Sequence, residues 1–154
     1  MNELINKTKF DINDIIEILP HRYPFIFIDR IEIVKPGKSL LALKNLTINE
    51  PFFQGHFPGQ PVMPGVISLE IMAQAGSFLM LNQVEDPLSK NMFFTSVEKA
   101  RFKKPIVPGD QLRIEVDLLK KKLNLCKFHG RCIVEQVLVA ESFFSANLVA
   151  RARV

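Results

Sequence analysis

The segment from Val66 to Asn82 is apolar on nearly every side of the helix that its sequence predicts. Its polar residues Glu70, Gln74 and Ser77 are spaced at i, i+4 and i+7, so they form one narrow stripe along that helix. A helix of this kind is buried inside a protein or crosses a membrane. With about 17 residues, interrupted by Glu70 and Gln74, it is a poor membrane span. We therefore expect a long central helix enclosed by a sheet.

Runs of β-branched and aromatic residues on both sides of this helix predict strands. The clearest is 111–120, where Leu112, Ile114 and Val116 alternate with charged residues and predict one dry face and one wet face. The other runs span residues 25–34, 39–48, 91–102, 125–134 and 136–150.

A short helix is predicted at residues 11–19, with Asp11 as its N-cap and Pro20 as its stop. The order of a short helix, two strands, a long helix and several strands is typical of an α+β fold with an antiparallel sheet. The chain has no internal repeat or Gly/Ser-rich linker, so we expect a single domain over residues 1–154.

Composition and charge disfavour several classes of protein. The net charge is +4, but the basic residues are scattered without interleaved aromatic residues, which disfavours nucleic-acid binding. The first ten residues, MNELINKTKF, lack the apolar run of a secretory signal. Cys126 and Cys132 would lie about 20 Å apart on one strand, too far for a disulfide. We expect free thiols and a cytoplasmic protein that has no membrane segment.

Residues 55–65, GHFPGQPVMPG, form a proline- and glycine-rich connection just before the long helix. The prolines stiffen this connection and the glycines allow tight turns, so His56 is held in a preformed loop. Gly65 stands where unpaired N–H groups at the helix start favour an anionic oxygen. Together with Glu70, these residues supply a base, an acid and an oxyanion donor, a set that suits proton abstraction next to a carbonyl.

Simpler interpretations exist for these residues. His56 is also consistent with a surface loop residue, and the stripe with Glu70 is consistent with a helix face that reaches solvent. A metal site is disfavoured because His56 and Glu70 lack the spacing of helical zinc ligands and no third ligand is evident. His129 lies in a strand-like run with no acidic neighbour in sequence, so we expect it on the surface.

Three blocks of the sequence resemble one enzyme family. They are LPHRYPFIFIDR (19–30), GHFPGQPVMPGVISLEIMAQAG (55–76) and ARFKKPIVPGDQL (100–112). Through them the chain, from about residue 11 to 150, is similar to the FabZ family of 3-hydroxyacyl-(acyl-carrier-protein) dehydratases of type II fatty acid synthesis. The resemblance implies a hot dog fold, in which a curved antiparallel sheet wraps a long central helix. It also implies a homodimer formed through the sheets and a homohexamer built as a trimer of dimers.

The same resemblance implies the catalytic residues. His56 and Glu70 match the family's catalytic pair, which comes from two subunits and shares a tunnel at their interface. The implied reaction removes water from a (3R)-hydroxyacyl thioester to give the trans-2-enoyl product. His56 would take the α-proton, the Gly65 amide would polarise the thioester carbonyl, and Glu70 would protonate the departing hydroxyl. The resemblance implies no cofactor or metal.

Further residues are implied to bind the substrate and its carrier. The expected tunnel residues are Leu19, Pro20, His21, Phe57 and Phe93. For His21 we expect a lining role, not catalysis. The partner implied is acyl carrier protein with its acyl chain on 4′-phosphopantetheine, and the basic residues expected to dock it are Arg101, Lys103 and Lys104.

Two departures from the family pattern stand out. Phe93 occupies the place of a tyrosine proposed to gate the tunnel, so the hydroxyl of that gate is missing here. Glu135 and Gln136 replace an Asp-Gly type of turn, and neither residue favours positive φ, so we expect a longer or different loop there.

Other functions on the same fold are a dehydratase that also isomerises the double bond, a thioesterase, and a non-catalytic acyl-binding protein. Glu70 disfavours the isomerase, whose members typically have Asp there, and the intact His56 and Glu70 pair disfavours the thioesterase. The sequence does not indicate the preferred acyl chain length.

Overall fold

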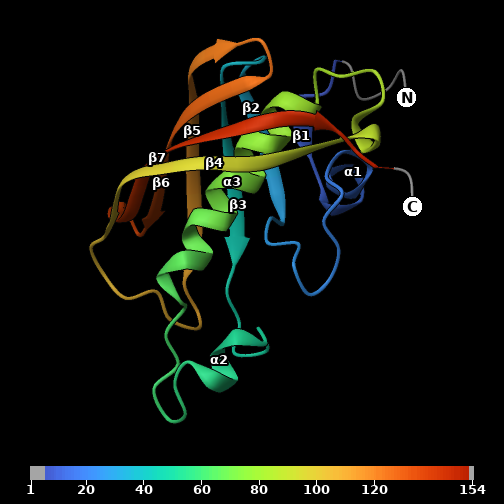
Figure 1. Cartoon of the computed structure of the whole chain (residues 1–154). Coiled ribbons are helices and arrows are strands. Elements are labelled where there is room, and N and C mark those ends of the chain that lie inside the picture. The colour runs from blue at the N-terminus through green and yellow to red at the C-terminus, as the bar shows by residue number, and fades with distance from the viewer. Residues whose placement is uncertain (1–5, 153–154) are drawn as a thin grey trace.

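The computed structural model describes residues 6–152. In this range the elements follow the predicted α+β order (Figure 1). They are β1 (Lys9–Phe10), α1 (Ile12–Ile18), β2 (Arg30–Lys35), β3 (Ser39–Asn45), α2 (Phe52–Gly55), α3 (Gly65–Leu81), the 3-10 helix η1 (Pro87–Ser89), β4 (Lys90–Phe102), β5 (Gln111–Lys122), β6 (Leu125–Val134) and β7 (Val137–Ala150). The short elements β1, α2 and η1 were not predicted because two to four residues carry no readable period.

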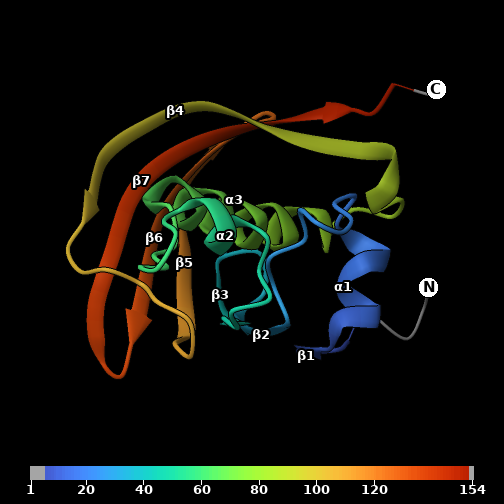
Figure 2. The same ribbon diagram turned by 90° about the horizontal axis from the view of Figure 1, so that it is seen from below.

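The strands of this range form one seven-stranded sheet in the order β1-β2-β3-β5-β6-β7-β4. Every neighbouring pair is antiparallel, which confirms the predicted sheet type. The sheet curves around α3, and its long strands β4 and β7 arch over the helix (Figure 2). This strand order leaves β4 at one edge of the sheet. Among the described residues, no helix is long and apolar enough to cross a membrane.

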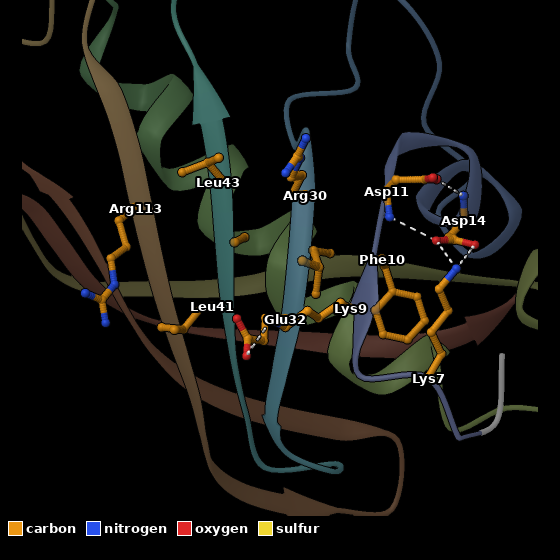
Figure 3. A pocket seen from close by; sticks show the side chains of 12 residues that line it. Lys7, Lys9, Phe10, Asp11, Asp14, Arg30, Glu32, Leu41, Leu43 and Arg113 are labelled. Atoms are coloured by element: carbon orange, nitrogen blue, oxygen red, sulfur yellow. Dashed lines mark hydrogen bonds and ion pairs between the residues drawn. The ribbon is translucent and has the colours of Figure 1, made fainter.

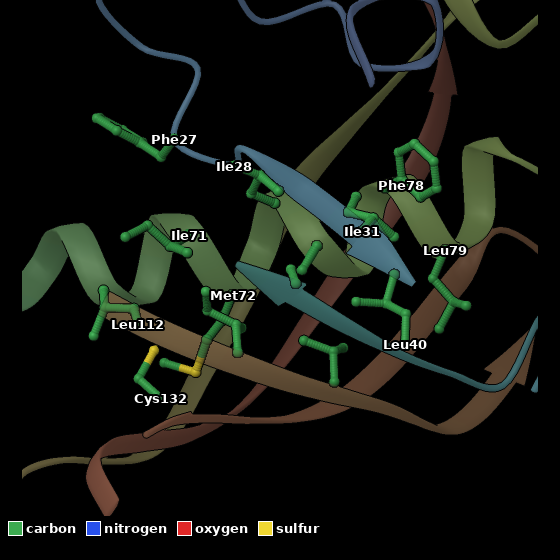
Figure 4. Close-up of a cluster of buried hydrophobic side chains, with 14 of the residues drawn as sticks. Phe27, Ile28, Ile31, Leu40, Ile71, Met72, Phe78, Leu79, Leu112 and Cys132 are labelled. Carbon is green, nitrogen blue, oxygen red and sulfur yellow. The ribbon is translucent and has the colours of Figure 1, made fainter. Parts of the chain in front are cut away.

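The core lies between α3 and the concave face of the sheet (Figure 4). Ile71, Met72, Phe78 and Leu79 of α3 have no exposed surface, which confirms the prediction of a buried central helix. Burying each such side chain stabilises the fold by about 1.5–3 kcal/mol. The sheet contributes buried residues from four central strands, among them Leu40, Ala42, Leu112, Ile114, Val116, Phe128 and Phe144.

The predicted strand over residues 25–34 was wrong in its first half, because β2 begins only at Arg30. The buried amide of Gln74 provides the physical reason. Its Nε2 donates to the Phe25 carbonyl at 2.8 Å and its Oε1 accepts from the Phe27 N–H at 3.0 Å. These two backbone groups are satisfied by a side chain of α3, so residues 25–27 run along the helix. Bonding to β3 begins at Asp29, whose N–H donates to the Leu43 carbonyl at 2.8 Å.

The prediction of a longer or different loop at Glu135 and Gln136 was also wrong. Val134 pairs with Val137, so the two residues form a tight two-residue turn. Both adopt positive φ, 47° and 67°. The right-handed twist of the flanking strands favours this turn geometry, and the long β6–β7 ladder outweighs the poor preference of the two side chains.

Gly130 in β6 allows α3 to approach the sheet, and alanine at this position is expected to destabilise the protein. An added Cβ would lie 2.5 Å from Met72 Sδ, 2.9 Å from its Cγ and 3.0 Å from its Cβ. We expect Gly130→Ala to lower the free energy of unfolding by about 1–3 kcal/mol, measured by urea unfolding at one protein concentration. Gly55→Ala is the matched control, since no atom lies within 4 Å of its added Cβ. Equal effects at both positions would contradict this packing argument.

Candidate active site

His56 follows α2 and begins a loop that holds its ring in one orientation. The ring Nδ1 lies 2.6 Å from the Val62 carbonyl oxygen, while the Val62 N–H donates to the His56 carbonyl at 2.8 Å. A carbonyl oxygen only accepts hydrogen bonds, so Nδ1 must carry the proton. In the neutral ring Nε2 therefore has a free lone pair, which is the form needed by a general base.

The rest of this loop is closed by its own hydrogen bonds. Phe57 and Gln60 exchange backbone bonds of 3.0 and 2.9 Å, and Gly59 supplies a positive φ of 76° between them. The Phe57 ring stacks on the His56 ring with centroids 4.0 Å apart. Phe57 is itself half-exposed, and Figure 1 shows α2 and this loop projecting from the sheet beyond the start of α3.

Gly65 begins α3 and lies directly against β4. A Cβ at Gly65 would lie 2.9 Å from Phe102 Cδ1, so a side chain here would displace the Phe102 ring. The first N–H groups of a helix have no acceptor within the helix and lie at the positive end of its dipole. Glycine is therefore required here for the close packing of Phe102, and the start of α3 provides a backbone donor; the oxyanion role of Gly65 stays a prediction.

Glu70 lies one turn further along α3 and is half-buried. Its Oε1 accepts a hydrogen bond from Gln74 Nε2 at 3.0 Å and lies 3.6 Å from His21 Nε2. Burial raises the pKa of the Glu70 carboxyl, and the Gln74 hydrogen bond opposes this only in part. Burial, with a smaller effect of the Arg22 charge, lowers the pKa of His21. Both shifts favour uncharged side chains.

Glu70 and His21 line a pocket of about 420 Å³. Of the predicted tunnel residues, Pro20, His21 and Phe93 line it, whereas Leu19 is fully buried in the core and Phe57 lies on the His56 loop. His56 is not among its lining residues. The sequence analysis did not predict the other residues that line this pocket. Among them only Ser77, at i+7 from Glu70, could have been predicted, because it belongs to the polar stripe of the helix. The missed lining residues are Ser77, Leu81, Asn91, Met92, Phe94 and Arg151.

Comparison with known proteins identifies the family. Residues 19–142 match the model of the FabA-like domain. The chain is 48% identical over 145 residues to the 3-hydroxyacyl-(acyl-carrier-protein) dehydratase FabZ of Koribacter versatilis, covering 94% of this chain and 93% of the relative. It is 47% identical over 144 residues to FabZ of Geotalea uraniireducens, covering 93% and 99%. This chain belongs to the FabZ family. The family resemblance of the three sequence blocks is thereby confirmed.

Solved structures confirm the hot dog fold of this FabZ family member. The dehydratase heterocomplex ApeI:P from Xenorhabdus doucetiae superimposes with a TM-score of 0.77 at 16% identity, covering 89% of this chain and 91% of that chain. A hypothetical thioesterase with coenzyme A from Streptococcus pneumoniae gives a TM-score of 0.58 at 12% identity, covering 80% and 88%. At these identities the likeness establishes the fold alone.

The predicted docking residues of this FabZ chain follow or end β4. Lys103 and Lys104 line a pocket of about 290 Å³ together with Gly65, Val62 and Phe102. All three basic residues are exposed, and Lys103 Nζ is 3.8 Å from Glu141 Oε1. Two of the three basic residues therefore lie beside the start of α3.

A separate cavity of about 510 Å³ lies where β1, β2, β3 and β5 meet the first turn of α1 (Figure 3). Its charged side chains largely pair with one another. Lys7 Nζ is 2.6 Å from Asp14 Oδ2, and Lys9 Nζ is 4.0 Å from Glu32 Oε1. Its lining includes carboxylates but no histidine, so it lacks the histidine base that the sequence analysis expects for dehydration.

The expectation of a surface His129 without an acidic partner was wrong. Its Nε2 lies 3.4 Å from Glu141 Oε2 across the β6–β7 pair, and its ring stacks on Phe143 with centroids 4.3 Å apart. Residues distant in sequence become neighbours in the antiparallel ladder, which the local sequence does not reveal. Within residues 6–152 no three His, Cys, Asp or Glu side chains converge as a metal-binding group.

Proposed function

We propose that this protein dehydrates (3R)-hydroxyacyl-(acyl-carrier-protein) to trans-2-enoyl-(acyl-carrier-protein) in fatty acid biosynthesis. Its FabZ relatives are named for 3-hydroxyacyl-(acyl-carrier-protein) dehydration. The observation that carries the proposal within this chain is the hydrogen bond from His56 Nδ1 to the Val62 carbonyl, because in the neutral ring it places the free lone pair on Nε2, where a base needs it.

The proposed reaction uses three groups. His56 Nε2 takes the proton from the carbon next to the thioester carbonyl, and the Gly65 N–H stabilises the negative charge that develops on the carbonyl oxygen. Glu70 donates its proton to the hydroxyl on the next carbon, which leaves as water while the double bond forms. Burial raises the pKa of Glu70 and so favours the protonated form that this role needs. The cycle closes when the proton on His56 returns to Glu70 through solvent.

We propose that His56 and Glu70 of one site belong to two copies of the chain. In support, His56 does not line the pocket that holds Glu70. The edge strand β4 also exposes Phe93, Phe94 and Val97, an apolar surface that a second copy would cover. The proposed assembly is a homodimer, with a homohexamer formed from three dimers.

The proposed partner is acyl carrier protein with its acyl chain on 4′-phosphopantetheine. Arg101, Lys103 and Lys104 offer positive charge to an acidic carrier beside the pocket that includes Gly65. Phe93 lines the Glu70 pocket and is half-exposed, so we assign it to the tunnel entrance, where it acts without a hydroxyl. We place the enzyme in the cytoplasm, where its two buried cysteines remain reduced.

The test is enoyl absorbance over time after mixing the purified protein with a 3-hydroxyacyl carrier-protein substrate. We expect the 2-enoyl product to form without added metal or cofactor. Release of free carrier thiol would indicate a thioesterase instead. Binding of the acyl substrate without any product would favour the alternative, a non-catalytic acyl-binding protein.

A further inference from the structure

Both polar neighbours of the Glu70 carboxyl approach the same oxygen. Gln74 Nε2 lies 3.0 Å from Oε1, and His21 Nε2 lies 3.6 Å from the same atom. Within the described chain, Oε2 has no hydrogen-bond partner. The carboxyl is therefore held on one side by α3 and by the loop after α1, while its second oxygen is left for the pocket.

The surroundings of His21 indicate which form of its ring faces Glu70. Its Nδ1 is buried without a hydrogen-bond partner, and it is the one such side-chain nitrogen or oxygen in residues 6–152. A charged imidazole would bury an unpaired N–H together with its charge, which is the most costly form. The neutral ring with its proton on Nε2 leaves only a lone pair unpaired on Nδ1. Burial also lowers the pKa of His21, in agreement with a neutral ring.

A neutral His21 with its proton on Nε2 directs an N–H toward Oε1, as Gln74 does. Two donors at Oε1 match the carbonyl oxygen of a protonated carboxyl group, which accepts hydrogen bonds. The acid proton then belongs on Oε2. We propose that His21 is a positioning residue that, with Gln74, orients the Glu70 carboxyl so that the proton on Oε2 faces the substrate. This inference rests on the proposed dehydration.

The same arrangement stabilises the product of proton transfer. When the Oε2–H bond breaks and the leaving hydroxyl gains that proton, Glu70 becomes a carboxylate that already faces two N–H groups. The separation of 3.6 Å exceeds a hydrogen bond, and such catalytic contacts are often long before substrate binds. The nearby charged groups are Arg151, in the same pocket, and Arg22, which donates to the carbonyls of Ile16, Leu19 and His21.

The test compares His21→Phe, which keeps a ring but has no donor, with His21→Gln, whose amide reaches the position of Nε2. For each protein we would measure kcat and KM, and follow Glu70 by NMR of 13C-labelled glutamate, its signal assigned by its loss in Glu70→Gln. We expect His21→Phe to lower kcat about 10-fold with little change in KM, and to raise the titration midpoint of Glu70 by roughly one pH unit. His21→Gln should restore both toward wild type.

Met92→Leu is the matched control, because Met92 lines the same pocket and has no polar contact with Glu70. It should alter KM alone. If His21→Phe also alters KM alone and leaves the Glu70 titration unchanged, His21 is only a tunnel wall and the inference is wrong. His21→Leu supplies a second donor-free variant if His21→Phe does not fold. If wild type makes no enoyl product, the proposed function is refuted. A shifted Glu70 titration in His21→Phe would in that case still establish the contact between His21 and Glu70.

Discussion

Replacing His56 with alanine is expected to lower kcat by about 10²- to 10⁴-fold, the usual contribution of a general base. The His56 ring is held by its Nδ1 bond to the Val62 carbonyl, and Nε2 is the atom proposed to accept the α-proton. The measurement is the initial rate of enoyl formation at saturating substrate. Since His56 follows α2 and is not part of the hydrophobic core, the variant should unfold at a temperature close to that of wild type.

His129→Ala is a suitable control for His56→Ala. His129 is also half-buried, is stacked on a phenylalanine and lies beside an oxygen atom, but it faces Glu141 on β7 and no part of the Glu70 pocket. It should retain nearly all of the activity. Comparable losses in both variants would mean that general destabilisation, not base catalysis, explains the effect at His56.

Mixed assemblies test whether one site uses two chains. In a dimer of one His56→Ala chain and one Glu70→Gln chain, one site loses both groups and the other keeps both. Coexpression of the two inactive variants should therefore restore about one quarter of wild-type activity, because random pairing gives half mixed dimers with one intact site each. No recovery, in spite of mixed dimers seen by mass spectrometry, would place both residues of a site in one chain.

The strongest sequence patterns predicted the parts of the fold that are decided locally. The apolar segment of α3 and the alternation in β5 each reflect burial along a single element. Such a pattern can be recognised from the amino-acid sequence alone. The start of the strand predicted from residue 25 was wrong because Gln74, 47 residues from Phe27, bonds the Phe25 carbonyl and the Phe27 N–H. A contact over that separation is a property of the assembled fold.

The candidate site likewise has a part that the sequence predicted and a part that only the structure shows. His56, Gly65 and Glu70 lie in one continuous block, whose rigid loop and polar stripe were visible in the sequence. The contact between His21 and Glu70 could not be seen in the sequence, since it depends on how the loop after α1 packs against α3. Arg151, which joins the pocket from beyond β7, likewise has no sequence signal. The residues proposed for the chemistry could therefore be picked out from the sequence, whereas the orientation of their side chains required the tertiary structure.

Glu70→Gln is expected to reduce kcat by about 10²- to 10⁴-fold, since it removes the acid proton while keeping the shape of the side chain. The amide oxygen of the substituted side chain can still accept from Gln74, so the local structure should be retained. The measurement is again the initial rate of enoyl formation. Met92→Leu, which changes a lining residue of the same pocket but keeps Glu70 and its Gln74 bond, should leave kcat nearly unchanged. A comparable loss of kcat in both variants would contradict the assignment of Glu70 as the acid.

The same substitution should make the protein more stable at neutral and alkaline pH. Burial raises the pKa of Glu70 in the folded chain above its ordinary value of 4.5, so the folded state binds this proton more tightly than the unfolded state does. Wild type therefore loses stability as the pH rises from about the ordinary value through the folded pKa, and Glu70→Gln does not. Thermal unfolding at a series of pH values should show similar midpoints in acid and a higher midpoint for Glu70→Gln above the folded pKa. Equal midpoints throughout would mean that Glu70 is not held in its protonated form, and the acid role would then need a different source of the proton.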